Sequence, residues 1–307
     1  MNITKRTGEW LQIIVPAEWD GITVEDLFRT VWRAPKKLTH HFRTENKVLL
    51  EGNRVNWHTP LSAGSRLQLH LFEEEPSQVI PTYHEINILF EDDHVLLINK
   101  PPFMNTHPNN PAVDTDTLMN AAAFYLLSKG ESANVRQIHR LDRDTSGAIL
   151  FAKHALGGAV LDHMLEKREI KRTYIAGVHG LVNKRKGILN MPIGRDRHHA
   201  TRRRVSPTGQ AAVTHYEVLE INKQKEYSFI KCWLETGRTH QIRVHFSHIG
   251  HPLIGDDLYG GERVTNRQAL HAAKLEFIHP FTLELINCHA PFTDLSEFFH
   301  HIDINKI

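Results

Sequence analysis

The spacing of apolar residues divides the chain into two parts, and the first of them covers residues 11–72. Thr23 is placed to cap a helix, with Asp26 three residues later in a capping-box position. The apolar residues that follow repeat at helical spacing and are Val24, Leu27, Phe28, Val31 and Trp32. A repeat of this kind predicts a helix with one buried face.

A second helix and a small sheet complete the pattern of this first part. Pro35 suits a first helical position, and the helix that it opens carries Lys36 and Lys37. Gly52-Asn53 lies between two short apolar runs and predicts a two-residue hairpin turn. Leucines then alternate with polar residues over 66–71, as in a half-buried strand. We therefore expect a small α+β domain over residues 1–75.

A change in composition separates this domain from the rest of the chain. The stretch 73–82 contains three acids and two prolines without any apolar period, so residues 76–82 are interpreted as a linker. Residues 83–307 form a second domain dominated by strands. Its clearest strands are residues 95–99, which must end before Pro101, and residues 148–152, 171–178 and 227–234. Helices are expected over 156–165 and after Thr239, the latter ending at Gly250.

Composition and charge narrow the range of functions. The 307 residues are 40% hydrophobic and 23% charged, as in an ordinary globular protein. No apolar run reaches the length of a membrane span, and the first residues lead into no secretory core. Two cysteines outside any CxxC pair favour a reducing cytoplasm over a disulfide framework.

The net charge of +2 is small, but arginine and lysine gather between residues 184 and 204. Clustered basic side chains are typical of phosphate contacts, although a solvated charged loop would look the same. The members of this cluster that we expect to contact nucleic acid are Arg195, Arg202, Arg203 and Arg204.

The residues 139–147 are the strongest candidate for chemistry. They place Asp142 and Asp144 in a turn-forming stretch beside arginines, immediately before a buried strand. A partly shielded carboxylate near fixed positive charge can act as a nucleophile or base. A capped turn with an exposed ion pair explains the same residues, and the residues alone do not choose between the two acids. A hydrolase with paired carboxylates also stays open.

Metal and nucleotide sites are weakly supported. His245, His248 and His251 are spaced by three, but Gly250 interrupts their helix and no HExxH motif is present. No serine-centred GxSxG, Walker loop or dinucleotide GxGxxG stands in the required context. The residues alone therefore favour neither a metal site nor a nucleotide site.

Taken together, six ordered motifs resemble the pseudouridine synthases that modify large-subunit ribosomal RNA and transfer RNA. The motifs occupy residues 91–101, 139–147, 171–180, 236–245, 250–260 and 270–273. The first domain in turn resembles the small RNA-binding domain named after ribosomal protein S-four. That match is partial, since Gly52-Asn53 replaces the usual Asn-Gly turn and Ser65 stands where an acid is common.

The resemblance implies an α+β fold: a mixed, mainly antiparallel catalytic sheet with a central cleft, plus the small RNA-binding domain. It also implies that the protein uses no metal and no organic cofactor. It implies that Asp142, and not Asp144, is catalytic, that Tyr174 stacks near the target base, and that Arg238 is the ion-pair partner of Asp142. Residues expected to bind the RNA substrate are His139, Arg140, Lys36 and Lys37, with the four arginines above.

The activity implied is isomerisation of a uridine that has been flipped out of its RNA stack. Two other functions stay open: an RNA-binding or ribosome-assembly factor with a vestigial site, and a nucleoside glycosidase. The first predicts loss of Asp142, Tyr174 or Arg238, and all three are present. The second predicts release of free uracil.

Overall fold

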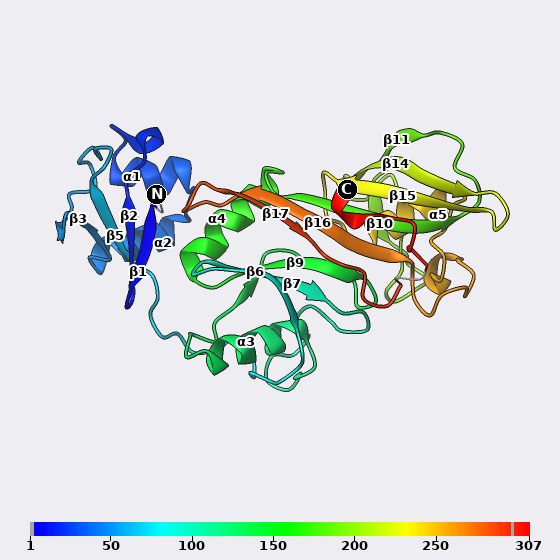
Figure 1. The fold of residues 1–307 in the computed structure, drawn as a ribbon, viewed down its shortest axis with the longest axis horizontal. Helices are drawn as coiled ribbons and strands as arrows, with labels where there is room; N and C mark the ends of the chain where they lie inside the picture. The colour runs from blue at the N-terminus through cyan, green and yellow to red at the C-terminus, as the bar shows by residue number, and fades with distance from the viewer. Residues whose placement is uncertain (1–2, 296–297) are drawn as a thin grey trace.

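A computed structural model describes residues 3–295 and 298–307 of the chain and shows two domains side by side (Figure 1). The N-terminal domain contains a five-stranded sheet in the order β1-β2-β5-β3-β4. Its strands are β1 (Thr4–Thr7), β2 (Trp10–Ile14), β3 (Val48–Leu50), β4 (Asn53–Arg54) and β5 (Arg66–His70). Its helices are η1 (Ala17–Trp19), α1 (Val24–Asp26), the π-helical turn η2 (Leu27–Val31) and α2 (Lys36–Thr44).

Local signals in this domain were largely correct. The predicted capping box is present, with the Thr23 side chain accepting from the Asp26 amide and Asp26 accepting from the Thr23 amide. The hairpin turn is displaced by one residue, because Leu50 pairs with Asn53 and leaves Glu51 and Gly52 as the turn. Both turn residues have positive φ, as a two-residue hairpin requires. The prediction of Gly52-Asn53 as the turn is therefore wrong by one position.

The second domain is a mixed sheet of ten strands, and most of its pairs are antiparallel. The order along its main path is β11-β14-β15-β10-β16-β9-β7-β6, with β17 beside β16 and β8 beside β9. The strands are β6 (Asn87–Glu91), β7 (Val95–Lys100), β8 (Arg136–Gln137), β9 (Ser146–Ala152), β10 (Lys171–His179), β11 (Lys186–Asn190), β14 (Val213–Asn222), β15 (Tyr227–Leu234), β16 (Leu270–Ile278) and β17 (Leu285–His289). This arrangement confirms the predicted fold class.

Helices and one hairpin surround this sheet. They are α3 (Leu118–Ser128), α4 (Ala155–Glu166), α5 (Gln241–His248), η3 (Asp257–Tyr259), η4 (Ile304–Lys306) and the two-stranded hairpin β12 (Ile193–Arg195) and β13 (Arg203–Val205). The predicted Thr239 cap is wrong, because His240 occupies the N-cap position in a left-handed conformation. Gly250 follows the helix with a φ of 84°, as expected for its end.

A short parallel contact between β9 and β16 lies at the centre of the sheet. Gly147 pairs there with Ala272, and its φ of 113° is one that side chains rarely adopt. A Cβ on Gly147 would lie 2.2 Å from the carbonyl oxygen of Ala272. Only glycine allows the two backbones to approach this closely, immediately after the residues 139–145.

The β16–β17 hairpin reaches the N-terminal domain (Figure 1). At its tip, the ring of Phe281 lies 5.5 Å from that of Trp32, whose indole Nε1 donates to the carbonyl of Pro280 at 3.4 Å. Trp32 and Phe281 are fully buried and belong to one apolar cluster that includes residues of both domains. The domains therefore share a core.

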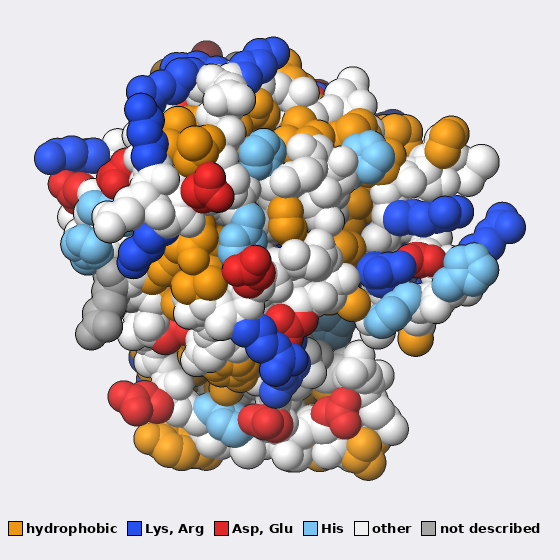
Figure 2. All heavy atoms as spheres, turned by 90° about the vertical axis from the view of Figure 1, so that its right-hand side faces the viewer, with side chains coloured by type: hydrophobic (Ala, Val, Ile, Leu, Met, Phe, Trp, Pro, Cys, Tyr) orange, Lys and Arg blue, Asp and Glu red, His pale blue; other side chains and the backbone are white. Residues whose placement is uncertain are grey.

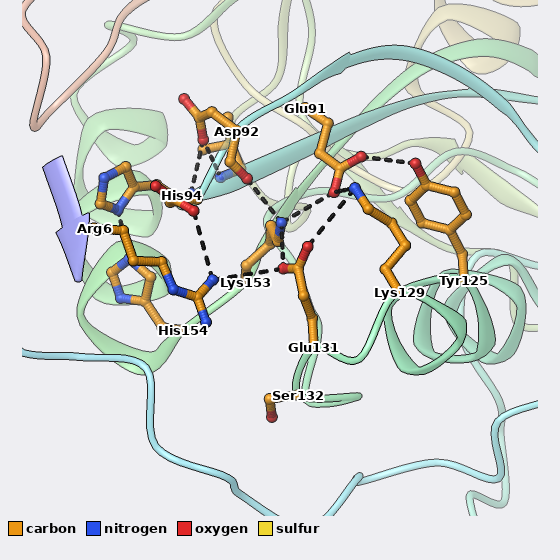
Figure 3. A network of polar contacts seen from close by, with 12 residues as sticks. Arg6, Glu91, Asp92, His94, Tyr125, Lys129, Glu131, Ser132, Lys153 and His154 are labelled. Carbon is orange, nitrogen blue, oxygen red and sulfur yellow. Dashed lines mark hydrogen bonds and ion pairs between the residues drawn. The ribbon is translucent and has the colours of Figure 1, made fainter. Parts of the chain in front are cut away.

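Charged side chains add a second contact between the domains, as Figure 3 shows. Arg6 of β1 lies 3.5 Å from Asp93 and 3.9 Å from Glu131. Lys153 forms ion pairs with Glu131 at 2.6 Å and Glu91 at 3.0 Å. The side chains of this network are largely buried around Lys153, so their ion pairs fix the edge of β1 against the second domain.

Two buried histidines lie beside these ion pairs. Nδ1 of His154 accepts from the amide of Gly157 at 3.0 Å, so its proton is on Nε2 and is donated to Nδ1 of His94 at 2.9 Å. Burial lowers the pKa of His154 to about 3 and holds the pKa of His94 well below its usual value. Both rings are therefore neutral parts of the core.

The segment predicted as a linker, residues 76–82, has no regular secondary structure, but it is packed against the second domain. Val79 is buried, and the hydroxyl of Ser77 donates to the carbonyl of Ala133 at 3.2 Å. The amide of Thr82 donates to the carbonyl of Asn120, also at 3.2 Å. These contacts attach the segment to α3 and its surroundings.

Candidate active site

The loop 139–145 joins β8 to β9 and forms one wall of a cavity of about 580 Å³. Within the loop, the amide of Thr145 donates to the carbonyl of Asp142 at 3.0 Å. His139 is buried, and its Nε2 accepts from the amide of Leu150 at 3.2 Å. Burial, followed by the charge of Arg172, lowers the pKa of His139 to about 3. The ring therefore stays neutral and attaches the loop to β9.

The carboxylate of Asp142 is held by an arginine. Its Oδ2 accepts from Nη1 of Arg243 at 3.0 Å and lies 3.9 Å from Nε2 of His240. Two other nitrogens of Arg243 donate to Asp256, Nε to Oδ2 at 2.7 Å and Nη2 to Oδ1 at 2.8 Å. One guanidinium thus bridges two carboxylates, one buried and one facing the cavity.

The environment of Arg243 keeps it charged. Its side chain is 8% exposed and that of Asp256 only 1% exposed. Burial works against the charged form, but the hydrogen bonds and charge of Asp256, together with those of Asp142, raise the pKa of Arg243 above its usual value. The ring of Tyr259 lies 5.0 Å from the guanidinium carbon and covers it.

This geometry corrects the expectation that Arg238 pairs with Asp142. Arg238 is exposed, and its Nε donates to the carbonyl of Ala211 at 3.1 Å. The reason is the start of α5: Arg238 lies in the loop before the helix, whereas Arg243 lies in its first turn, where residues 241–246 are all buried. Arg238 still lines the cavity.

Two further cations hold the loop from behind. Nζ of Lys100 donates to the carbonyls of Arg143, Met104 and Pro101 at 2.7–2.9 Å, and burial, followed by the charge of Arg267, lowers its pKa to about 7. Arg267 donates to the carbonyl of Asp144 and forms an ion pair with Asp294 at 2.7 Å. Sequence reasoning assigned neither residue a role, although Lys100 stands in the first motif.

Tyr174 and two arginines complete the cavity. Tyr174 is 5% exposed, and burial raises the pKa of its hydroxyl, an effect that the nearby charge of Arg172 opposes. Arg140 and Arg172 line the same cavity. Neither forms an ion pair within the described part of the chain, and Nε of Arg172 is buried without a hydrogen-bond partner there. The cavity therefore offers uncompensated positive charge beside a tyrosine and a carboxylate.

The other residues expected to bind RNA lie outside the cavity. Lys36 and Lys37 are exposed on α2, and Arg195, Arg203 and Arg204 lie on the β12–β13 hairpin, which packs against α5. Arg202 pairs with Asp196 at 2.7 Å. Because α2 and α5 lie in different domains at opposite ends of Figure 1, these basic residues form two separate groups. Figure 2 shows the end near α5, where lysine and arginine side chains gather along two edges.

Two of the three spaced histidines, His245 and His251, have structural partners. His245 contacts the hydroxyl of Thr214 and the carbonyl of Met191, both at 2.9 Å, and thereby uses both ring nitrogens. His251 contacts the carbonyl of His179 at 2.9 Å. Among the residues that the structure describes, no cluster of three or more histidine, cysteine or acidic side chains could hold a metal ion.

Comparison with known proteins decides the family. The profile of the RNA pseudouridylate synthase family matches residues 94–248, and that of the RluD ribosomal pseudouridine synthase N-terminal domain matches residues 11–67. An uncharacterized RNA pseudouridine synthase, YhcT of Bacillus subtilis, is 48% identical over 286 residues, which are 93% of this chain and 94% of YhcT. The chain belongs to the RNA pseudouridine synthase family.

Other members of the family agree with this assignment. Ribosomal large subunit pseudouridine synthase D of Haemophilus ducreyi is 38% identical over 243 residues, 74% of each chain. Human RNA pseudouridylate synthase domain containing 4 superposes with a TM-score of 0.54 at 25% identity, covering 70% of this chain and 90% of the human one. Human RNA pseudouridylate synthase domain containing 1 has the same fold, with a TM-score of 0.55 at 22% identity over 76% and 98% of the two chains.

The synthase assignment agrees with the activity expected from the motifs. The described helices of this pseudouridine synthase include none that is both long enough and apolar enough to cross a membrane.

Proposed function

We propose that this pseudouridine synthase acts on large-subunit ribosomal RNA in the cytoplasm and that Asp142 is its catalytic carboxylate. The substrate proposal is supported by the similarity to enzymes named ribosomal large subunit pseudouridine synthase D. The proposal for Asp142 depends on one observation: its Oδ2 is fixed by Arg243, while Oδ1 has no hydrogen-bond or ion-pair partner among the described residues and borders the cavity. A carboxylate held by one oxygen keeps the other for reaction.

The chemistry needs a carboxylate in this state. Asp142 either attacks C1′ of the ribose or begins elimination by way of a glycal, and the bond between C1′ and uracil N1 breaks with its electron pair on the base. The base turns within the cavity and its C5 forms the new bond to C1′. On the first route the bond between Asp142 and C1′ breaks as this bond forms, and on the second route Asp142 takes the C2′ proton during elimination and returns it to C2′. C5 then loses its proton, N1 gains one, and the net change is an isomerisation.

The cavity residues have roles that follow from their positions. Tyr174 lies on β10 and lines the cavity, and its proposed role is to stack its ring on the base and to take the C5 proton with its hydroxyl oxygen. Arg140 is exposed at the cavity and suits the space that the flipped base leaves in the RNA stack. Arg172 and Arg238 offer positive charge to the backbone phosphates.

The test is tritium release from RNA labelled at C5 of uridine. In-vitro transcripts of large-subunit ribosomal RNA, small-subunit ribosomal RNA and transfer RNA are compared, and we expect release only from the first. Asp142→Asn should abolish release, whereas Asp144→Asn should retain it. The side chain of Asp144 is more exposed than that of Asp142, and among the described residues it forms an ion pair only with its neighbour Arg143. Activity in the Asp142 variant would refute the catalytic assignment, and release from transfer RNA alone would refute the substrate.

The other functions considered from the sequence give different results in this assay. A vestigial RNA-binding factor would bind the transcript without releasing tritium. A glycosidase would release free uracil, which chromatography of the products detects. Tyr174→Phe keeps the ring but lacks the hydroxyl, so the variant separates stacking from proton removal.

A further inference from the structure

His240 connects the cavity to Tyr259, which lies in the motif 250–260 but to which sequence reasoning assigned no role. Its Nδ1 lies 2.8 Å from the hydroxyl of Tyr259, and that hydroxyl accepts from the main-chain amide of Arg203 at 2.9 Å. Its Nε2 lies 3.9 Å from Oδ2 of Asp142. The contacts form a chain from strand β13, through two side chains, to the carboxylate.

The chain determines which ring nitrogen carries the proton. Tyr259 is 9% exposed, and its hydroxyl oxygen already accepts from Arg203. The hydroxyl proton finds an acceptor among the described residues only at Nδ1 of His240, and a buried donor without an acceptor is costly. Nδ1 is therefore the acceptor, and the ring proton lies on Nε2, facing Asp142. Burial lowers the pKa of His240, so the ring is neutral near pH 7.

We propose that His240 is a positioning residue for Asp142 and is held in its Nε2–H form by Tyr259; this inference rests on the proposed function. Arg243 and His240 approach the same oxygen, Oδ2, from α5 and its N-cap. When the target nucleotide fills the cavity and excludes water, the N–H of His240 completes the hydrogen bonding of Oδ2. Oδ1 then keeps one orientation toward the sugar.

The proposal also connects RNA binding with the chemistry. Tyr259 accepts from the backbone of β13, and β13 pairs with β12 in the hairpin that carries Arg195, Arg203 and Arg204. Binding of phosphates by this hairpin holds β13, and with it the hydroxyl that selects the ring form of His240. Loss of the hydroxyl in Tyr259→Phe should therefore lower kcat more than it raises KM.

Two amide variants separate positioning from structure. His240 has a φ of 59°, which asparagine tolerates better than most residues. His240→Asn places an amide at the position of Nδ1 and keeps the contact to Tyr259, but it removes the donor that faces Asp142. His240→Gln places an amide N–H at the position of Nε2 and keeps that donor.

The expected result is a split between the variants in tritium release from the large-subunit RNA transcript. We expect kcat to fall about 100-fold in His240→Asn with KM unchanged, because a misplaced carboxylate costs rate and not binding. His240→Gln should stay within about 10-fold of the wild type, despite its less suitable backbone preference. Thermal unfolding of both variants provides the folding control. Equal losses of kcat in both, or a wild-type kcat in His240→Asn, would overturn the proposal.

A measurement without RNA keeps this test separate from the proposed function. Long-range ¹H–¹⁵N spectra of the ¹⁵N-histidine-labelled full chain report the protonated nitrogen of each ring, and the signals of His240 are those lost in His240→Gln. We expect the pure Nε2–H form in the wild type and a mixture in Tyr259→Phe. A wild-type ring protonated on Nδ1 overturns the inference even if the enzyme is active. If the wild-type spectrum shows the Nε2–H form of His240 but no tritium is released, the proposed function is refuted and the assignment of the His240 proton is retained.

Discussion

Removal of Arg243 should destabilise the protein mainly because Asp256 is left buried without its ion-pair partner, and less because Asp142 loses its own. In Arg243→Met both oxygens of Asp256, whose side chain is 1% exposed, lose the only side-chain donors that the described part of the chain gives them. Asp142 is 17% exposed and can recruit water. Leaving one member of a buried ion pair without its partner costs about 3–5 kcal/mol. At a urea dependence of about 3 kcal/mol per molar, the unfolding midpoint should fall by at least about 1 M.

A second substitution tests the physical reason. Arg243→Met combined with Asp256→Leu removes both buried charges, and such replacements are often neutral for stability. We expect the double variant to recover most of the midpoint and to remain inactive, because Asp142 still lacks its partner. Circular dichroism in urea measures the midpoint and tritium release measures activity.

Arg238→Met is the matched control, because Arg238 is exposed and forms no ion pair among the described residues. Its unfolding free energy should stay within about 0.5 kcal/mol of the wild type. If Arg243→Met unfolds at the wild-type midpoint, or the double variant is no more stable than the single one, the reasoning is refuted.

Three further outcomes are expected. Gly147→Ala should lower the melting temperature, because its Cβ would lie 2.2 Å from the carbonyl oxygen of Ala272; an unchanged calorimetric melting temperature would contradict this. The pKa of His154 is about 3 in the folded protein, below its ordinary value near 6.5, so its contribution to stability is complete above pH 6.5 and is lost as the pH falls toward 3. Between pH 6 and 5 the unfolding free energy, measured in urea, should therefore change less steeply with pH in His154→Asn than in the wild type. The two slopes should differ by at most about 1.4 kcal/mol per pH unit, and the exposed-site control His198→Asn should keep the wild-type slope. Arg172→Ala should raise KM for the RNA and reduce the salt dependence of binding by about one phosphate contact, and an unchanged slope in filter binding would argue against a phosphate there.

Local sequence signals predicted the elements around the site well. The strands β9, β10 and β15 and the helix α4 lie within one or two residues of their predicted positions. Each has a strong apolar pattern or a clear boundary residue. The predicted cap at Thr239 was wrong because a left-handed His240 delays the start of α5 by a residue, and no propensity rule favours histidine there.

The partner of Asp142 was harder to predict. Arg238 and Arg243 both stand in one motif, five positions apart, and the sequence does not show which of them faces Asp142. The choice depends on where the helix begins and on Asp256, which lies 13 positions after Arg243 and fixes the guanidinium from its far side. The burial of residues 241–246 on all sides of α5 also departs from the pattern of a surface helix.

Contacts between the domains could not be predicted from local patterns. Trp32 was predicted as part of a buried helical stripe. It is buried, but it lies one residue after η2, and Val31 of the same stripe is 44% exposed. The partners of Trp32, Pro280 and Phe281, lie about 250 residues further along the chain. The buried histidines His94 and His154 likewise meet across 60 residues. Such contacts depend on the order of strands in the sheet, which the periodicity of single strands does not contain.

Strand β16 has a consequence for the spacing between two contacts on a bound RNA. Its first residues pair with Gly147 beside the loop 139–145, and the hairpin at its other end packs against Trp32 of the N-terminal domain. Nine residues of extended strand span roughly 30 Å. Because the shared core prevents the domains from sliding past each other, β16 keeps a constant distance between the loop 139–145 and the N-terminal domain. An RNA that contacts both domains must present its target uridine at a set distance from a second contact, and a substrate of matching sequence but different shape would fail to reach Asp142.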